Sequence, residues 1–322
     1  MNGKRRKEMF CFGVDIGGTT IKLGLFDLQG DVLDKWEIPT RKEDEGKNIL
    51  PDAARAVLSK MNERSLSKED VAGIGVGVPG PVKEDGTVET AVNLGWDYMD
   101  VQGTMQKETG LPVKVSNDAN VAALGEAWVG GAKGCKDVIL ATLGTGVGGG
   151  LITNGKIITG AHGAGGEIGH MHLIDDFPHA CNCGNYGCLE QVASATGITY
   201  LAEKALADSQ EASVLRDRKV SAKAVFDAVK ENDALAIATA EQFGKYLGKA
   251  LAMIAAVTDP EVIVIGGGVS KAGTVLLDFV EKNFQVYAFS SCRKATFALA
   301  ELGNDAGIFG AAKMALDTYA SK

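Results

Sequence analysis

Residues 12–30 read FGVDIGGTTIKLGLFDLQG, two apolar runs joined by a glycine turn. The first run reaches Asp15, Gly17 and Gly18 form a tight turn, and residues 21–26 return as a second strand. Such a hairpin presents backbone N–H groups and threonine hydroxyls around a cavity that suits a phosphate. An ordinary glycine-turn hairpin is the plainer alternative for this segment taken alone.

Residues 138–155, VILATLGTGVGGGLITNG, repeat this plan of strand, glycine turn and strand. Two copies indicate a duplicated α/β architecture, in which the hairpins face one another across a cleft and hold a polyphosphate from both sides. The dinucleotide pattern G-x-G-x-x-G is formally present at Gly144, Gly146 and Gly149. A second strand follows it instead of a helix, so the dinucleotide interpretation is excluded.

A third glycine cluster, VIVIGGGVS at residues 262–270, follows a buried strand and precedes a helical stretch over 271–283. Its backbone can lie flat against a planar ligand such as an adenine-ribose unit. Strand-to-helix glycine turns are common in α/β proteins, so this cluster is weak evidence by itself.

Asp118 lies in LPVKVSNDAN, residues 111–120, where a strand ends and a helix begins. This position faces the ligand crevice in α/β sheets. Asp is also a favoured helix N-cap, which is the competing interpretation. Because Asn117 and Asn120 add more hydrogen-bonding capacity than a cap requires, the pattern favours a functional role.

The stretch HMHLIDDFPHACNCGNYGCLE, residues 170–190, carries three cysteines spaced C-x-C-x4-C with histidines upstream. Thiolate and imidazole at this spacing suit a tetrahedral zinc ion. Spacing leaves His172 and His179 as rivals of His170 for the fourth ligand. Glu167 and Glu190 flank the stretch, so the metal would fix an irregular loop beneath a site where carboxylates bind sugar hydroxyls.

Composition restricts the class of protein. The 322 residues are 45% hydrophobic and 23% charged, enough for a sizeable core and two domains. A net charge of −8 disfavours a large nucleic-acid or membrane surface. The basic start MNGKRRKEMF is not followed by a secretory apolar core, and no apolar run reaches the roughly 20 residues of a membrane helix. Clustered and scattered free cysteines are typical of the reducing cytosol.

Seven motifs together resemble the ROK family of repressors and sugar kinases, and within it the bacterial glucokinases. The motifs are DIGGTTIK (15–22), SNDAN (116–120), LGTGVGGG (143–150), GAGGEIGH (163–170), CNCGNYGCLE (181–190), VIGGGVS (264–270) and LGNDAGIFGAA (302–312). The resemblance implies an α/β, actin-like (ribonuclease H-like) ATPase fold with two domains around a central cleft. The expected small domain spans 1–116 plus 307–322, and the large domain with the zinc loop spans 117–306.

The resemblance also implies an ATP-dependent hexose kinase of carbohydrate metabolism in the cytoplasm, a homodimer or higher homo-oligomer, with no nucleic-acid or membrane partner. Asp118 would be the general base for phosphorylation of the glucose 6-hydroxyl, with magnesium accompanying ATP and zinc playing a structural role. The implied sugar-binding residues are Asn93, Asn117, Asp118, Glu167, His170 and Glu190. The implied ATP-binding residues are Asp15, Gly17, Gly18, Thr19, Thr20, Lys22, Gly144, Thr145, Gly146, Gly266, Gly267 and Gly268. The implied zinc ligands are His170, Cys181, Cys183 and Cys188.

Three alternatives remain open at the level of sequence. The sugar could be N-acetylmannosamine, N-acetylglucosamine, allose or fructose, and polyphosphate could replace ATP. A sugar-responsive repressor of the same family would carry a helix-turn-helix of several dozen residues, whereas the first expected strand begins near Phe10. A non-enzymatic, zinc-stapled binding module would not explain the paired hairpins or Asp118.

Overall fold

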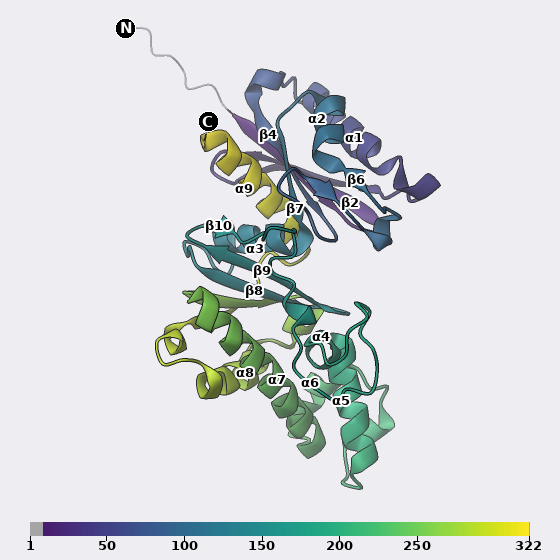
Figure 1. Cartoon of the computed structure of the whole chain (residues 1–322), viewed down its shortest axis with the longest axis vertical. Coiled ribbons are helices and arrows are strands. Elements are labelled where there is room, and N and C mark those ends of the chain that lie inside the picture. Colours follow the sequence, from purple (N-terminus) through teal and green to yellow (C-terminus); the bar gives the residue numbers. More distant parts are fainter. Residues whose placement is uncertain (1–8, 322) are drawn as a thin grey trace. The chain divides into compact units, whose positions relative to one another are not determined.

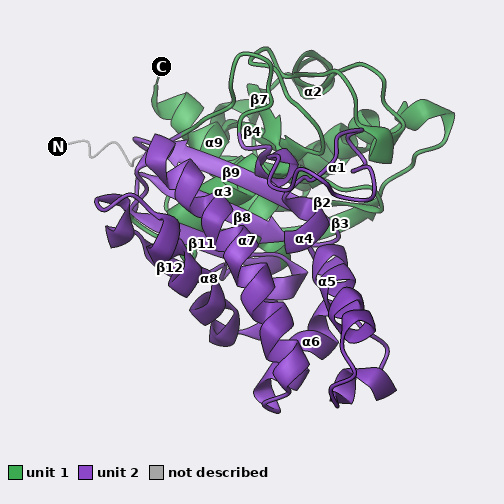
Figure 2. Cartoon of the chain, turned by 60° about the horizontal axis from the view of Figure 1, so that its bottom comes forward, with its two compact units in different colours: residues 1–134, 157–165, 304–322 green, residues 135–156, 166–303 purple. Residues whose placement is uncertain are grey.

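The computed structural model describes residues 9–321, so most of the basic start lies outside the described residues. The chain divides into two compact units (Figure 2): unit 1 holds the chain up to residue 134, residues 157–165 and the chain from 304, and unit 2 holds residues 135–156 and 166–303. The expected boundaries after 116 and before 307 differ from these limits. The reason is that the helix following residue 117 packs against the closing helix of unit 1.

Unit 1 is built on a mixed five-stranded sheet with the order β3-β2-β1-β4-β7 (Figure 1). β1, β2 and β3 are antiparallel neighbours, and β4 and β7 join parallel to β1. This is the ribonuclease H-like arrangement that was predicted. The elements are β1 Phe10–Ile16, β2 Thr20–Asp27, β3 Val32–Pro39, α1 Ile49–Glu63, β4 Val71–Val78, β5 Thr87–Val88, β6 Met99–Asp100, α2 Val101–Thr109, β7 Val113–Asn117, α3 Asp118–Val129 and α9 Ala306–Ala320.

Helices cover both faces of this sheet. Apolar side chains of α1 and α2 form one core with the strands, and α9 packs on the opposite face beside α3. Close approach of α9 depends on Gly13 of β1 and Gly75 of β4, which are paired in register. A Cβ at either position would overlap a backbone carbonyl of α9, at Ile308 and Ala311 respectively. These glycines therefore allow α9 to lie directly on the strands.

Unit 2 contains a second mixed sheet with the order β10-β9-β8-β11-β12, in which β8, β11 and β12 are parallel and β8 and β9 form the predicted hairpin. Its helices enclose a core that includes the buried rings of Phe226, Phe243 and Phe284. The elements are β8 Val138–Leu143, β9 Val147–Thr153, β10 Lys156–Ile157, α4 Glu190–Ala193, α5 Ala195–Asp208, α6 Ala222–Lys230, α7 Ala234–Thr258, β11 Val262–Gly266, α8 Thr274–Tyr287 and β12 Thr296–Leu299.

The helix expected over 271–283 is divided. A short 3-10 helix spans Gly268–Ala272, and α8 begins only at Thr274. Gly273 separates the two with a φ of 87°, a left-handed conformation that glycine adopts without steric cost. Within residues 9–321, no helix is long and apolar enough to cross a membrane.

Candidate active site

Asp118 is the first residue of α3, at the carboxyl end of the parallel strand β7. The N-cap is its neighbour Asn117, whose Oδ1 accepts hydrogen bonds from the backbone N–H groups of Ala119 (2.9 Å) and Asn120 (3.3 Å). Asn117 also donates from Nδ2 to the carbonyl of Gly80 at 3.1 Å, which ties α3 to the end of β4. Asn117 and Asn120 are buried, whereas Asp118 is exposed. Asn117 is thus the N-cap, while the solvent-exposed Asp118 carboxylate also accepts the N–H of Ala119 through Oδ1 at 2.8 Å.

Asp15 lies near the carboxyl end of β1, at the same edge of the sheet as Asp118. Burial, and after it the negative charge of Asp118, raise the pKa of Asp15 to about 6, although the positive charge of Lys22 acts in the opposite direction. Two carboxylates that influence each other in this way form an acidic pair that suits a hydrated divalent cation. Gly307 leaves room for Asp15, because a Cβ there would lie 2.5 Å from the Asp15 carboxyl carbon.

The backbone of the turn between β1 and β2 is held by one hydrogen bond within the turn and one from the Thr40 side chain. The N–H of Gly17 donates to the carbonyl of Thr20 at 3.0 Å, and the Thr40 hydroxyl donates to the carbonyl of Gly17 at 2.7 Å. Asn93 lies against this turn, since a Cβ on Gly18 would come within 3.4 Å of the Asn93 carbonyl oxygen. Two of the residues expected at the phosphate and sugar sites are thereby neighbours within unit 1.

Lys22 has a different neighbour from the one expected. Its ammonium donates to the carbonyl of Asn304 at 2.7 Å, and Lys35 pairs with Asp305 at 2.6 Å. Both contacts hold the segment that leads into α9. A role of Lys22 at a phosphate stays a prediction.

In unit 2, the turn between β8 and β9 is braced by the start of α5. Within the turn, the N–H of Gly144 donates to the carbonyl of Gly146 at 3.0 Å. The N–H of Ala195 donates to the Gly144 carbonyl at 2.8 Å, and the Thr196 hydroxyl donates to the Thr145 carbonyl at 2.9 Å. Backbone hydrogen bonds and the Thr196 hydroxyl therefore hold the turn, and the side chains of the turn itself take no part in these contacts.

The glycine turn after β11 contacts the β8–β9 turn. Gly267 has a φ of 81°, and a Cβ there would lie 2.5 Å from the Leu143 carbonyl oxygen. Beside it is a pocket of about 350 Å³, lined by apolar groups including Val269 and Phe226 together with Gly268. Lys223, Asp227 and Lys271 also line this pocket, whose size and apolar side chains suit an adenine ring.

The zinc stretch brings four ligand groups together. The ligand atoms of His170, Cys181, Cys183 and Cys188 all lie within 4.8 Å of one another. The Sγ atoms of Cys183 and Cys188 are 3.7 Å apart, and Cys181 Sγ lies 3.7 Å from Nδ1 of His170. A tetrahedral zinc with Zn–S bonds of about 2.3 Å separates its sulfur ligands by about 3.8 Å. The cluster therefore fits zinc and supplies four protein ligands, as a structural site requires.

The rival histidines do not belong to this cluster. His172 uses Nδ1 for a contact of 2.8 Å with the carbonyl oxygen of Tyr186, and its Nε2 lies 3.1 Å from Asp175. The backbone carbonyl of His179 accepts a hydrogen bond from Gln191. Among the histidines in the described part of the chain, His170 is the one placed to complete the zinc site.

Glu190 links the zinc cluster to the β8–β9 turn. Its Oε1 lies 3.0 Å from Cys181 Sγ and 3.9 Å from His170 Nδ1. Its other oxygen lies against Gly146, where a Cβ would overlap it. Glu167 is exposed and precedes the 3-10 turn Ile168–His170, which packs on β9. Unit 2 thus holds Glu167, His170 and Glu190 on the elements adjoining the zinc site.

Comparison with known proteins assigns the family. The ROK family model matches residues 11–318. The chain belongs to the ROK family. It is 46% identical over 309 residues to a glucokinase of Halalkalibacterium halodurans, with 94% of each chain covered.

Two solved structures are also similar to this ROK chain. A ROK hexokinase from Thermus thermophilus has a TM-score of 0.82 and 31% identity, with 98% of this chain and 100% of that chain covered. A ROK glucokinase from Streptomyces griseus in complex with glucose and AMPPNP has a TM-score of 0.73 and 33% identity, with 95% and 98% covered. The predicted family and fold are confirmed.

Sequence reasoning on this ROK chain missed the residues that brace the site. Thr196 and Ala195 hold the β8–β9 turn, and Phe226 lines the pocket beside Gly268. These residues lie on helices, and the apolar spacing of those helices made them look like ordinary core or surface residues. The one available signal was Ser194, an N-cap residue directly before the helix that contacts the turn.

Proposed function

We propose that this chain is an ATP-dependent hexose kinase that transfers the γ-phosphate of ATP to the 6-hydroxyl of glucose. The observation that carries the proposal is the arrangement at the end of β7. Asn117 caps α3, and the exposed Asp118 carboxylate, whose Oδ1 accepts the N–H of Ala119, lies beside the carboxylate of Asp15. The resemblance to glucokinases over nearly the whole chain supports glucose as the substrate.

Asp118 acts as the general base. A sugar hydroxyl is a weak nucleophile, so its proton passes to the Asp118 carboxylate as the oxygen attacks the γ-phosphorus and the bond to ADP breaks. Base catalysis of this kind contributes typically about 10²–10⁴-fold. The remaining acceleration comes from alignment of the two reactants and from stabilisation of charge on the transferring group.

The two glycine turns bind the phosphates through backbone N–H groups, and the adenine occupies the pocket beside Gly268. Magnesium bound with ATP would neutralise phosphate charge, and Asp15 would orient its waters. Residues Thr19, Thr20 and Thr145 add hydroxyls to the turns. Polyphosphate as a donor would use the same turns and leave the adenine pocket empty.

The zinc cluster has a supporting role. Four protein ligands leave no position for an activated water. His170, Cys181, Cys183 and Cys188 would hold zinc, which would fix the loop that carries His170, with one imidazole nitrogen of His170 on the metal and the other toward the sugar. Glu167 and Glu190 complete the sugar-binding groups on this unit.

The decisive variant is Asp118→Asn, which keeps the size of the side chain and removes the base. We expect kcat to fall by about 10²–10⁴-fold, with glucose affinity measured by calorimetry nearly unchanged. Asp31→Asn, at the exposed turn before β3, is the matched control and should retain full activity. An Asp118→Asn enzyme with normal turnover would remove Asp118 from the base role.

Substrate choice is tested by initial rates with magnesium-ATP across hexoses and N-acetylhexosamines. We expect the highest kcat/KM with glucose. A clear preference for an N-acetylated sugar would contradict the assignment to glucose while leaving sugar kinase activity in place.

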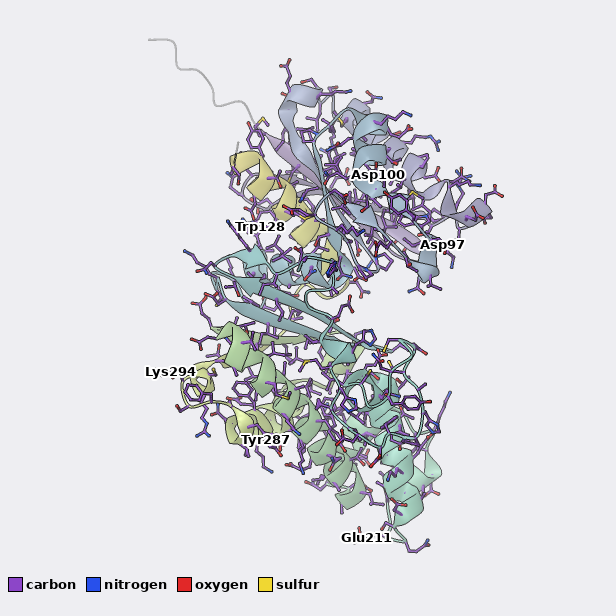
Figure 3. All side chains as sticks on the ribbon, viewed as in Figure 1. Asp97, Asp100, Trp128, Glu211, Tyr287 and Lys294 are labelled. Atoms are coloured by element: carbon purple, nitrogen blue, oxygen red, sulfur yellow. The ribbon has the colours of Figure 1, made fainter. Side chains whose placement is uncertain are left out.

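We also propose that the protein self-associates through a surface of unit 2 at the carboxyl-terminal ends of α7 and α8. Five large apolar side chains there are exposed: Met253 (47%), Val257 (86%), Val286 (67%), Tyr287 (41%) and Phe289 (66%). They come from the last turns of α7 and α8 and the residues after α8 (Tyr287 is labelled in Figure 3). Clustered exposure of this kind marks an interaction surface, and a second copy of the chain is the partner that a symmetric dimer provides.

Light scattering after size exclusion tests this surface. The variant Val257→Lys/Phe289→Lys should shift the protein from dimer to monomer. Tyr319→Lys, which changes an exposed aromatic residue (45%) on α9, is the control and should leave the dimer intact. A monomeric unmodified protein would contradict the proposal.

We place the protein in the cytosol. All six cysteines are free in the structure, and three of them serve a metal site that oxidation would destroy. Cell fractionation with immunoblotting checks this location.

A further inference from the structure

Unit 2 contains a second pocket, of about 420 Å³, that none of the proposed sugar, phosphate or zinc residues lines. Its walls come from α5, from α7 and from residues 174–178, the segment that leads to the zinc ligand Cys181. Its volume lies within the range of small-molecule sites. The lining residues are Ile174, Asp176, Phe177, Pro178, Val192, Tyr200, Leu201, Lys204, Ala205, Asp208, Ala238, Thr239, Gln242 and Tyr246.

The interior of this pocket is apolar and aromatic. The rings of Phe177 and Tyr200 lie 5.1 Å apart at an interplanar angle of 55°. Tyr246 contributes a third ring from α7, and Val192 and Leu201 add aliphatic surface. Such walls favour an apolar group of the size of a benzyl or isobutyl side chain over a polyhydroxylated sugar.

The rim of the pocket carries opposite charges that are not paired with each other. Lys204 and Asp208 are one turn apart on α5, yet no hydrogen bond or ion pair within residues 9–321 engages either side chain. Two other lysine–aspartate pairs with this spacing do form ion pairs, one starting at Lys223 in α6 and one at Lys313 in α9. Lys204 and Asp208 are therefore available to an ammonium and a carboxylate supplied by one ligand.

We propose that this pocket binds a free amino acid with a large apolar side chain, such as phenylalanine or leucine. The side chain enters among the three rings, the α-carboxylate pairs with Lys204, and the α-ammonium pairs with Asp208 or Asp176. A nucleotide fits poorly, since its phosphates would face two carboxylates and only one ammonium group.

Binding has a consequence for the neighbouring loop. Ile174 and the preceding residue donate their N–H groups to the carbonyl of Gly187, at 3.3 and 2.7 Å, next to the zinc ligand Cys188. A ligand that orders residues 174–178 therefore also orders the zinc loop, and by linkage raises affinity for the sugar. This second step rests on the proposed function, whereas binding itself does not.

Calorimetry with phenylalanine and the zinc-loaded protein tests binding directly. We expect saturable binding, weakened at least about tenfold for phenethylamine and for 3-phenylpropionate, because each lacks one charge. Lys204→Gln should weaken phenylalanine binding similarly, and Lys249→Gln, an exposed lysine of α7 outside the pocket, should not. Absence of binding, or equal binding of the singly charged analogues, would overturn the proposal.

A variant that fills the pocket distinguishes binding of an amino acid from binding of a second copy of the chain. Ala238→Trp should abolish phenylalanine binding while the thermal unfolding and basal kinase activity stay as in the unmodified protein. Retained binding by this variant would overturn the assignment of the pocket. A change of oligomeric state in Ala238→Trp would also overturn it, because a second copy would then be the occupant. If phenylalanine binds but leaves the glucose KM unchanged, the coupling to the sugar site is refuted.

Discussion

Replacing Asp15 by asparagine should stabilise unit 1 while abolishing turnover. The carboxylate is held in a partly buried position beside Asp118, and these two effects raise its pKa to about 6. Asparagine has the same shape and no charge. The substitution therefore removes the electrostatic cost of the ionised Asp15 carboxylate, and with it the group that we propose orients the magnesium-bound waters.

The size of the effect follows from the pKa. A tenfold change in proton affinity corresponds to about 1.4 kcal/mol, so raising the pKa from 3.8 to about 6 makes ionised Asp15 cost about 3 kcal/mol at pH 8. The pKa of Asp15 is higher in the folded state than in the unfolded state. Stability is therefore lost as the pH rises from about 3.8 to about 6, and it is constant above that range. At pH 5 the cost is about 1.6 kcal/mol, because most folded molecules hold the proton.

The gain from Asp15→Asn should therefore be larger at pH 8 than at pH 5, by about 1.4 kcal/mol. Urea unfolding followed by tryptophan fluorescence measures it, because all three tryptophans (Trp36, Trp96 and Trp128) lie in unit 1. Glu37→Gln, in β3 of the same sheet, is the control for loss of an exposed carboxylate. An equal or larger gain at pH 5 would refute the reasoning from burial and repulsion.

Three further outcomes are expected. Removal of zinc with a chelator should lower the thermal unfolding temperature and raise the glucose KM, and unchanged values after metal loss confirmed by mass spectrometry would contradict the supporting role of the cluster. Gly75→Ala should destabilise unit 1 by about 1–3 kcal/mol in urea, because its Cβ overlaps α9, whereas Gly144→Ala meets no atom within 4 Å and should not lower stability. Thr196→Val removes the hydroxyl that holds the β8–β9 turn at Thr145, so the ATP KM should rise several-fold; Thr199→Val, whose hydroxyl bonds only to its own helix, should leave it unchanged.

Local patterns along the chain predicted much of the fold. The hairpins of β1–β2 and β8–β9 were visible because apolar strands and glycine turns are properties of adjacent residues. The zinc ligands were predicted for the same reason, since Cys181, Cys183 and Cys188 lie in one short stretch. The choice of His170 over His172 needed the structure, because it depends on the contacts of His172 with Tyr186 and Asp175.

Other features depend on contacts between distant parts of the chain. The domain boundary expected near residue 116 ignored the packing of α3 on α9, which requires Gly125 and Gly310 to bring the two helices together. The sequence suggested that Lys22 supplies positive charge to a phosphate. Its hydrogen bond to Asn304 could not be predicted, because the two residues lie at nearly opposite ends of the sequence. No pattern in adjacent residues reports such pairings.

The position of α9 in unit 1 has a consequence for biosynthesis. The strands that it covers are among the first residues made, and α9 is made only after the whole of unit 2. Until α9 has been made, the face of the first sheet that contains Gly13 and Gly75 lacks its cover. During that interval the nascent chain presents an apolar sheet surface that chaperones recognise. The strands of unit 1 are therefore made early, whereas the core between its sheet and α9 forms only once residues 306–320 have been made.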